Sequence, residues 1–219
     1  LSVAIVERGV WGGTCLNRGC VPKKTWYETA RAAAANERYA ARGLAGRLTP
    51  DLAQAWRHQH AVVRTVRESY VEYLRRLGVT SFAGAARFVD ARTLDVAGAR
   101  LSAQHIVIAT GSSPAWPAAL APHPDRILTT DDLFDRPVPA GRRVAVIGSG
   151  VVGTEMAFIL AALGCEVAWL TGATPLARDG YSAGALRVLA DALAARGLAP
   201  RTGSRPTGAE VRADGVGLR

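Results

Sequence analysis

The sequence predicts an α/β fold built from two consecutive units, each of them incomplete. Two short apolar runs rich in β-branched residues, "SVAIVE" at residues 2–7 and "RRVAVI" at residues 142–147, have the pattern of buried parallel strands. A glycine-rich turn and a helical pattern follow each run. With 219 residues and 49% hydrophobic content, the chain is long enough to bury the cores that two small domains require.

The first unit, residues 1–113, contains strand and helix patterns with one irregular insertion. Helical spacing begins at Thr25 and continues to about Arg42. A long helix then opens with the N-cap-like segment Thr49-Pro50-Asp51 and closes at Gly78. Residues 79–106 alternate short β-type runs with turn residues, which predicts a small antiparallel meander. The apolar run "IVIATGSS" at residues 106–113 predicts another buried strand, which ends in a turn of small residues.

A proline-rich segment, residues 114–140, predicts a linker before the second unit at residues 141–219. The stretch "RRVAVIGSGVVGTEMAFILAALGCEVAWL" has the order strand, glycine turn, helix and strand. The chain begins directly on a strand at Leu1, and the tail after Pro200 stops in mid-pattern. We therefore expect both units to be fragments of longer domains.

Charge and apolar patterning argue against two classes of partner. The net charge is +9, but the arginines are scattered at helix-surface spacing without interleaved aromatic residues, so we expect no nucleic-acid binding. No run of about 18 uncharged apolar residues occurs, and Glu7 and Arg8 interrupt the first apolar run, so we expect a soluble, cytoplasmic protein without a membrane partner. The only lysines, Lys23 and Lys24, are adjacent in a chain that otherwise uses arginine, which indicates a chemical need for them.

A dinucleotide-binding fingerprint opens the second unit. Gly148, Gly150 and Gly153 form G-x-G-x-x-G between a strand and an apolar helix, the context in which a helix N-terminus meets a pyrophosphate. The next strand lacks the terminal acid that binds a ribose 2′-hydroxyl, and Arg178 follows it; this favours NADPH and leaves NADH as the alternative. Glu7 ends "SVAIVE" as such an acid would, with its own glycine turn lying about 20 residues earlier, before this sequence begins.

Cys15 and Cys20, five residues apart, are compatible with a metal site, a structural disulfide or a redox couple. A metal site is disfavoured because no CxxC motif and no nearby histidine accompany them. A structural disulfide is disfavoured because so small a loop restricts little chain entropy and the compartment is reducing. Residues five apart in a regular helix are separated by a rise of about 7.5 Å, so a disulfide needs a distorted turn, which nearby glycines and Pro22 permit. Such a loop favours a disulfide that opens, whereas we expect Cys165 in the core.

Three segments together resemble one protein family. "GGTCLNRGCVPKK" at residues 12–24 resembles the redox-active segment of the class I flavoprotein disulfide reductases, which include lipoamide dehydrogenase, glutathione reductase and mercuric reductase. "IVIATGSSP" is similar to the turn that closes the flavin domain of that family, and "RVAVIGSGVVGTE" is similar to its NAD(P) turn. The resemblance implies two Rossmann-like domains, an incomplete FAD-binding domain at 1–113 and an incomplete NAD(P)-binding domain at 141–219.

The resemblance also implies a role for each matching residue. Cys15 corresponds to the thiol that attacks the substrate, and Cys20 to the thiol beside the flavin. Either Lys23 or Lys24 would approach the flavin and pair with Glu155, so that the cation is not buried alone. The other implied cofactor positions are Glu7, Gly12, Gly13, Thr14, Thr110 and Gly111 for FAD, and Gly148, Gly150, Val151, Gly153 and Arg178 for NADPH or NADH.

The implied activity is that of an FAD-dependent NAD(P)H:disulfide oxidoreductase acting on a lipoyl or small-molecule disulfide, as a homodimer when full length. Val151 stands where glutathione reductases have a tyrosine, so the disulfide substrate stays open. Mercuric reductase is the alternative within the family, and a non-catalytic nucleotide-binding redox sensor or an inactive fragment is the alternative outside it. None of His58, His60, His105 and His123 matches the catalytic His–Glu pair of the family, so we expect the fragment alone to be inactive.

Overall fold

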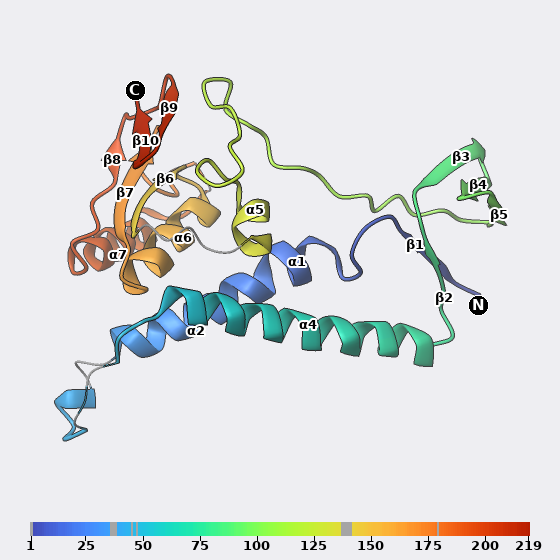
Figure 1. Ribbon diagram of the computed structural model, residues 1–219, viewed down its shortest axis with the longest axis horizontal. Coiled ribbons are helices and arrows are strands. Elements are labelled where there is room, and N and C mark those ends of the chain that lie inside the picture. The colour runs from blue at the N-terminus through green and yellow to red at the C-terminus, as the bar shows by residue number, and fades with distance from the viewer. Residues whose placement is uncertain (1, 36–38, 45, 47, 137–141, 179) are drawn as a thin grey trace.

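The computed structural model describes residues 2–35, 39–44, 46, 48–136, 142–178 and 180–219, and it combines helices with several small sheets (Figure 1). The helices are α1 (Gly13–Arg18), α2 (Cys20–Ala34), α4 (Leu52–Arg76), α5 (Thr130–Asp135), α6 (Val151–Ala162) and α7 (Ala183–Ala194). The strands are β1 (Ala4–Glu7), β2 (Thr80–Ala83), β3 (Ala86–Asp90), β4 (Thr93–Val96), β5 (Ala99–Ser102), β6 (Arg143–Ile147), β7 (Glu166–Thr171), β8 (Arg201–Thr202), β9 (Ala209–Arg212) and β10 (Gly215–Leu218).

The second unit contains a parallel sheet in the order β6-β7-β8. Strands β6 and β7 pair from Arg143 opposite Glu166 to Ile147 opposite Leu170, and α6 forms the crossover between them. Parallel neighbours require such a crossover, and the apolar run that precedes the glycine turn supplies the first strand. The predicted order of strand, glycine turn, helix and strand is therefore confirmed. An antiparallel hairpin of β9 and β10 follows.

The first unit has a shorter sheet than the sequence predicts. Strands β1 and β2 pair in parallel, and β3-β4-β5 form the predicted antiparallel meander. The prediction that the meander includes residues 79–85 was wrong, because residues 80–83 pair with β1 and join two segments that are far apart in the sequence.

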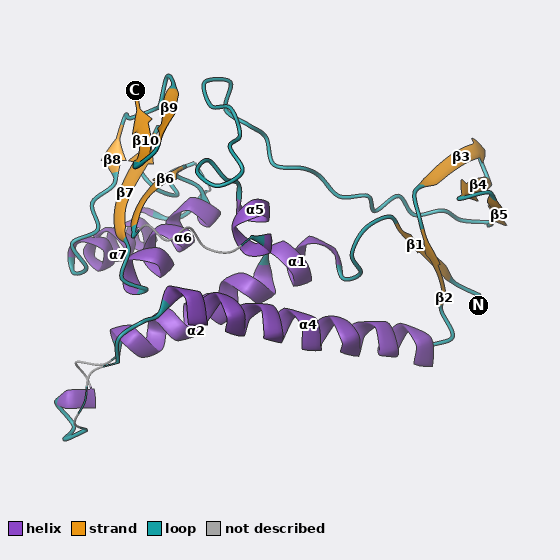
Figure 2. Cartoon of the chain, viewed as in Figure 1, coloured by secondary structure: helices purple, strands orange, loops and turns teal. Residues whose placement is uncertain are grey.

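The prediction of a buried strand at residues 106–113 was also wrong. The backbone there is irregular, and Val107 and Ile108 are 87% and 70% exposed. A buried strand needs a hydrogen-bonded neighbour, and within the described part of the chain no strand pairs with this run. The run instead belongs to the long connection between β5 and α5, drawn as loop in Figure 2.

Local signals set the helix ends. The side chain of Asp51 caps α4 by accepting a hydrogen bond from the Gln54 amide at 3.0 Å, so the predicted long helix and its N-terminal cap are confirmed. The preceding helix was expected to begin at Thr25. It begins earlier, at Cys20, because the backbone breaks at Gly19 and α2 starts directly after the break. That helix ends at Ala34, and residues 36–38 of its expected length lie outside the described residues.

The main hydrophobic core lies between helices of the two units. Trp26 of α2 is fully buried and meets Phe134 of α5 edge to face, with ring centroids 5.4 Å apart. Met156 and Ile159 of α6 complete this core with their buried neighbours. The expected linker, residues 114–140, thus contributes a packed helix, α5, whereas its boundary at residues 140 and 141 lies outside the described residues.

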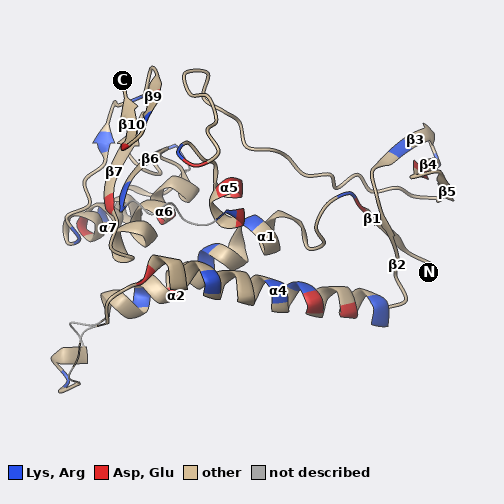
Figure 3. Ribbon diagram, viewed as in Figure 1, with Lys and Arg blue, Asp and Glu red and all other residues tan. Residues whose placement is uncertain are grey.

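Charged residues are dispersed over the surface. The ribbon in Figure 3 shows that basic and acidic residues are interspersed along α4. On this helix Glu72 pairs with both Arg75 and Arg76. Among the helices that the structure describes, none combines the length and the apolar character needed to cross a membrane.

We expect Phe134→Ala to lower the free energy of unfolding by about 3–5 kcal/mol, because it removes a buried ring from the core between the units. Tyr73→Ala, which truncates a ring that is 57% exposed, serves as the matched control and should cost far less. Urea denaturation measures both. Equal losses would show that α5 is not anchored by this ring.

The start of α5 should make stability depend on pH through Asp132. Burial opposes ionisation of this carboxyl, yet hydrogen bonds from the Thr129 amide and hydroxyl, with the nearby charges of Arg136 and Arg18, lower its pKa below the ordinary value of 3.8. A lowered pKa in the folded state means that the carboxylate stabilises the fold above the ordinary pKa. This contribution is lost as the pH falls through the folded-state pKa.

We therefore expect Asp132→Ala to lower the free energy of unfolding by about 1 kcal/mol at neutral pH, as loss of a cap does. The difference from the parent chain should shrink as the pH falls below 3.8 and through the lowered pKa of the parent carboxyl. Asp191→Ala removes an exposed carboxylate on α7 and is the control. A cost for Asp132→Ala that stays constant as the pH falls from 7 to well below 3.8 would contradict this assignment.

Candidate functional site

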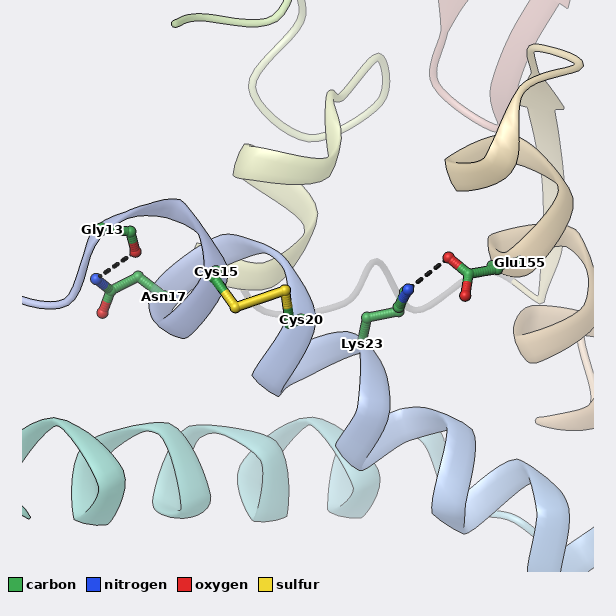
Figure 4. Close-up of a disulfide and its surroundings, with 6 residues drawn as sticks. All are labelled: Gly13, Cys15, Asn17, Cys20, Lys23 and Glu155. Carbon is green, nitrogen blue, oxygen red and sulfur yellow. Dashed lines mark hydrogen bonds and ion pairs between the residues drawn. A yellow bond between two sulfur atoms is a disulfide. The ribbon is translucent and has the colours of Figure 1, made fainter. Parts of the chain in front are cut away.

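The disulfide between Cys15 and Cys20 spans a break between two helices (Figure 4). Helix α1 ends at Arg18, the backbone at Gly19 adopts φ −135° and ψ −107°, and α2 begins at Cys20. The break brings the two cysteine Cα atoms to 4.7 Å, within disulfide range, as the expected distortion of the helix requires. A Cβ atom at Gly19 would lie only 3.0 Å from the carbonyl oxygen of Thr14, so glycine suits this close approach.

The entry to α1 also depends on glycine. Gly12 and Gly13 have φ values of +112° and +64°, in the left-handed region that other residues rarely adopt. The chain thereby turns sharply into α1 immediately before Thr14 and Cys15. Both cysteines of the pair are solvent-exposed, so the disulfide is accessible at the surface of the described chain.

Asn17 connects the disulfide loop to its surroundings, a role that the sequence analysis missed. Its side-chain amide donates to the carbonyl oxygens of Trp11 and Gly13 at 3.0 and 2.9 Å. Its Oδ1 atom accepts from Nε and Nη2 of Arg67 on α4 at 3.0 and 2.6 Å. An uncharged polar residue between two functional cysteines is the one sequence signal that could have drawn attention to it.

Arg18, also inside the disulfide loop, binds helix α5. Its Nη2 atom lies 2.6 Å from Oδ2 of Asp135, and its Nη1 atom lies 3.7 Å from Oδ2 of Asp131. The hydrogen bond to Asp135 raises the pKa of the guanidinium against the opposing effect of burial. The sequence offered no role for Arg18, and the structure shows that this residue ties the loop to a segment more than 100 residues away.

Lys23 and Glu155 form an ion pair that joins the two units. The Lys23 Nζ atom lies 2.5 Å from Oε2 of Glu155, and the side chains are 20% and 35% exposed. Lys24 points elsewhere, with its Nζ atom 5.7 Å from the centroid of the Tyr27 ring. Figure 4 shows the pair on the Cys20 side of the disulfide, since Lys23 follows Cys20 by one helical turn.

The glycine turn has the geometry of a dinucleotide-binding turn. Gly148 has a φ of +137°, and a Cβ atom at Gly153 would lie 2.6 Å from the Gly148 carbonyl oxygen, so α6 packs closely against the turn. The fully buried Trp169 donates its Nε1 hydrogen to that same oxygen at 2.8 Å. Gly150 and Val151 begin α6, and the turn borders a cavity of about 440 Å³ that Arg178 also lines.

Other predicted site residues lie apart from these groups. The Glu7 carboxylate accepts a local hydrogen bond from the Gly9 amide at 2.7 Å. Thr110 and Gly111 are exposed in the irregular connection before α5, and within the described chain neither is bonded to another predicted site residue. Burial raises the pKa of the Cys165 thiol, which lies in the core between the units as expected. The residues that the structure describes include no cluster of histidine, cysteine or acidic side chains that could hold a metal ion.

Comparison with known proteins supplies further findings. A protein-family model described as pyridine nucleotide-disulphide oxidoreductase matches residues 1–218. The chain is 36% identical to a mercuric reductase of Staphylococcus aureus over 75% of its length and 30% of the relative's. It is 33% identical to a glutathione reductase of Nostoc over 77% of its length and 36% of the relative's. It is 32% identical to a dihydrolipoyl dehydrogenase of Pseudomonas putida over its full length and 48% of the relative's.

The fold is also similar to that of solved structures. LpdA from Mycobacterium tuberculosis superimposes with a TM-score of 0.85 at 22% identity, over 99% of this chain and 49% of that protein. The chain therefore spans between about a third and a half of the length of these relatives.

We expect Lys23 and Glu155 to be coupled by about 1–2 kcal/mol, between the values for exposed pairs and for buried ones, because both side chains are partly shielded from water. A double-mutant cycle with Lys23→Met and Glu155→Gln, measured by urea denaturation, gives this coupling energy. The control cycle uses Glu72→Gln and Arg75→Gln, whose exposed pair should couple by less than about 0.5 kcal/mol. The absence of coupling between Lys23 and Glu155 would contradict the shielding inferred from the structure.

Proposed function

The chain belongs to the pyridine nucleotide-disulphide oxidoreductase family, and from this membership we propose that it carries the dithiol and dinucleotide-binding parts of an FAD-dependent NAD(P)H:disulfide oxidoreductase. The observation that carries the proposal is the exposed Cys15–Cys20 disulfide one helical turn from the ion pair of Lys23 and Glu155. This chemistry requires a dithiol, a cation whose charge is balanced by a carboxylate, and a turn that binds a dinucleotide. The turn in question leads into the helix that supplies Glu155.

The residues near these groups fit the two cofactors that the family uses. The Gly148 turn, with its close approach to Gly153, leaves the backbone open to a pyrophosphate, and Gly150 and Val151 begin the helix that faces it. Near the disulfide, the flavin would contact the strand-to-helix turn and a lysine, and the rest of FAD would meet the connection before α5. The residues assigned to FAD are Glu7, Gly12, Gly13, Thr14, Lys23, Thr110 and Gly111, and Arg178 is assigned to NAD(P)H. Bound FAD would supply two-electron transfer from NAD(P)H to the disulfide.

The cysteines then carry out thiol–disulfide exchange. Two electrons open the disulfide bond between Cys15 and Cys20, and Glu155 keeps the Lys23 ammonium neutralised beside it. The Cys15 thiolate attacks one sulfur of the substrate, which forms a mixed disulfide and releases the first thiolate. The Cys20 thiolate attacks the Cys15 sulfur, which releases the second thiolate and restores the original disulfide. The two released thiolates take up two protons from water.

The substrate is a lipoamide- or glutathione-type disulfide in this proposal, and Hg²⁺ is the alternative. Within the disulfide class, Val151 favours a lipoamide-type substrate, because glutathione reductases have a tyrosine at that position. The alternative is supported by the relatives named mercuric reductase. This chain is 36% identical to the one from S. aureus over the matched residues. In that case the dithiol would pass its electrons to a bound metal ion. We further propose that a chain of the relatives' length acts as a cytoplasmic homodimer.

The test is an anaerobic titration, first with NADPH and then with NADH, of the protein extended by its flanking reading frame to the length of its relatives. We expect a yellow protein that accepts two electrons per disulfide and gains a long-wavelength absorption band from thiolate beside flavin. Cys20→Ser should abolish the band. Cys165→Ser, which changes the buried third cysteine, should retain it and is the matched control. A colourless protein, or flavin reduction without the band, would leave the redox-sensor and inactive-fragment hypotheses.

A second measurement with the same protein identifies the substrate. Consumption of NADPH is followed with oxidised lipoamide, with glutathione disulfide and with Hg²⁺ in separate reactions. Turnover of one disulfide supports the first proposal, whereas turnover of Hg²⁺ alone would replace it with the alternative.

A further inference from the structure

The second strand of the dinucleotide unit ends without an acid. In such units an Asp or Glu at the end of this strand binds the ribose 2′-hydroxyl. Here β7 ends at Thr171, which is fully buried and directs its hydroxyl to the Arg201 carbonyl oxygen at 3.4 Å, and Gly172 follows. An unphosphorylated ribose therefore finds no carboxylate at this position.

Arg205 takes the space that a side chain at residue 172 would fill. A Cβ atom built on Gly172 would lie 2.5 Å from Nε of Arg205 and 3.0 Å from its Nη2 atom. The neighbouring backbone holds this arrangement, because the Ser204 amide donates to the Thr171 carbonyl oxygen at 3.1 Å. A guanidinium thus stands where an NAD-binding unit has a carboxylate, which reverses the charge presented to the ribose.

Arg178 brings a second guanidinium to the same cavity. The loop that carries it is fastened to the glycine turn by a hydrogen bond from the Leu176 amide to the Ser149 carbonyl oxygen at 2.8 Å. Arg178 and Arg205 line the cavity of about 440 Å³ together with Gly148 and Ser149, and its described lining contains no acidic residue. Among the described residues, no carboxylate forms an ion pair with either guanidinium.

We propose that Arg205, with Arg178 beside it, is a specificity-determining residue that selects a dinucleotide phosphorylated at the ribose 2′ position, NADPH over NADH. The inference rests on the proposed function in one respect, namely that the glycine turn holds a dinucleotide. A 2′-phosphate offers guanidinium groups a doubly charged, geometrically matched partner. A bare 2′-hydroxyl offers them only a neutral group, and Gly172 cannot accept a hydrogen bond from it through a side chain.

The test uses the chain itself and two nucleotides that differ only in the 2′-phosphate, adenosine 2′,5′-bisphosphate and adenosine 5′-monophosphate. Isothermal titration calorimetry at one fixed ionic strength should give at least about tenfold tighter binding of the bisphosphate. Arg205→Gln should remove most of this preference while changing the affinity for the monophosphate by less than about twofold. Arg187→Gln removes the same charge from an exposed position on α7 outside the cavity and should leave the preference intact.

Gly172→Asp provides a second, opposite variant. The new carboxylate would neutralise Arg205 and repel the 2′-phosphate, so the preference should fall as it does in Arg205→Gln. Circular dichroism checks that each variant has the secondary structure of the parent. Equal affinities of the parent chain for the two nucleotides, no binding of either, or equal loss in Arg187→Gln and Arg205→Gln would overturn the proposal.

The outcome of the binding test does not depend on the outcome of the flavin test. Adenosine 2′,5′-bisphosphate carries no nicotinamide and transfers no electrons, so its binding requires neither FAD nor the cysteines. A protein that prefers the bisphosphate but does not reduce flavin would keep the specificity assignment and lose the proposed activity. A protein whose flavin is reduced equally well by NADPH and NADH would keep the proposed activity and lose the specificity assignment.

Discussion

The packing of α2 against α6 holds the disulfide and the glycine turn before α6 in one structure. Trp26 follows Lys23 by one turn of α2, and Met156 and Ile159 lie next to Glu155 and one turn beyond it on α6. The ion pair therefore lies at the border of an apolar contact that buries a tryptophan. Apolar burial supplies most of the free energy of such a contact, whereas a partly shielded ion pair fixes which residues meet. A rotation of either helix would separate Lys23 from Glu155 and expose Trp26 at the same time.

The disulfide loop is held by contacts that do not depend on its sulfur atoms. Asn17 bonds to backbone on one side and to Arg67 on the other, and Arg18 binds Asp135 of α5. Opening the disulfide breaks a covalent bond but none of these contacts. The two cysteines remain at the ends of a loop that is anchored to α4 and α5. This arrangement suits a bond that is meant to break and re-form, because less conformational freedom is gained in the open state.

The sequence predicted what neighbouring residues determine and missed what distant residues determine. The glycine turn, the strands on either side of α6 and the cap at Asp51 follow from local patterns, and all of them are found. The bonds of Arg18 and Asn17 join residues 117 and 50 positions apart, which no local pattern encodes. The apolar run at residues 106–109 led to the wrong prediction of a buried strand. Its composition favours burial, but it does not indicate whether a partner strand is present. Lys23 could not be chosen over Lys24 before the helical phase of α2 and its contact with α6 were known.

The hydrogen bond from Trp169 to the glycine turn has an optical consequence. The indole is fully buried and donates to the carbonyl oxygen of Gly148, so its excited state responds to the position and charge of that turn. The turn that we propose to bind the dinucleotide therefore lies in contact with an intrinsic fluorophore. The difference in emission between the parent chain and a Trp169→Phe variant would report movement of the turn without any attached label.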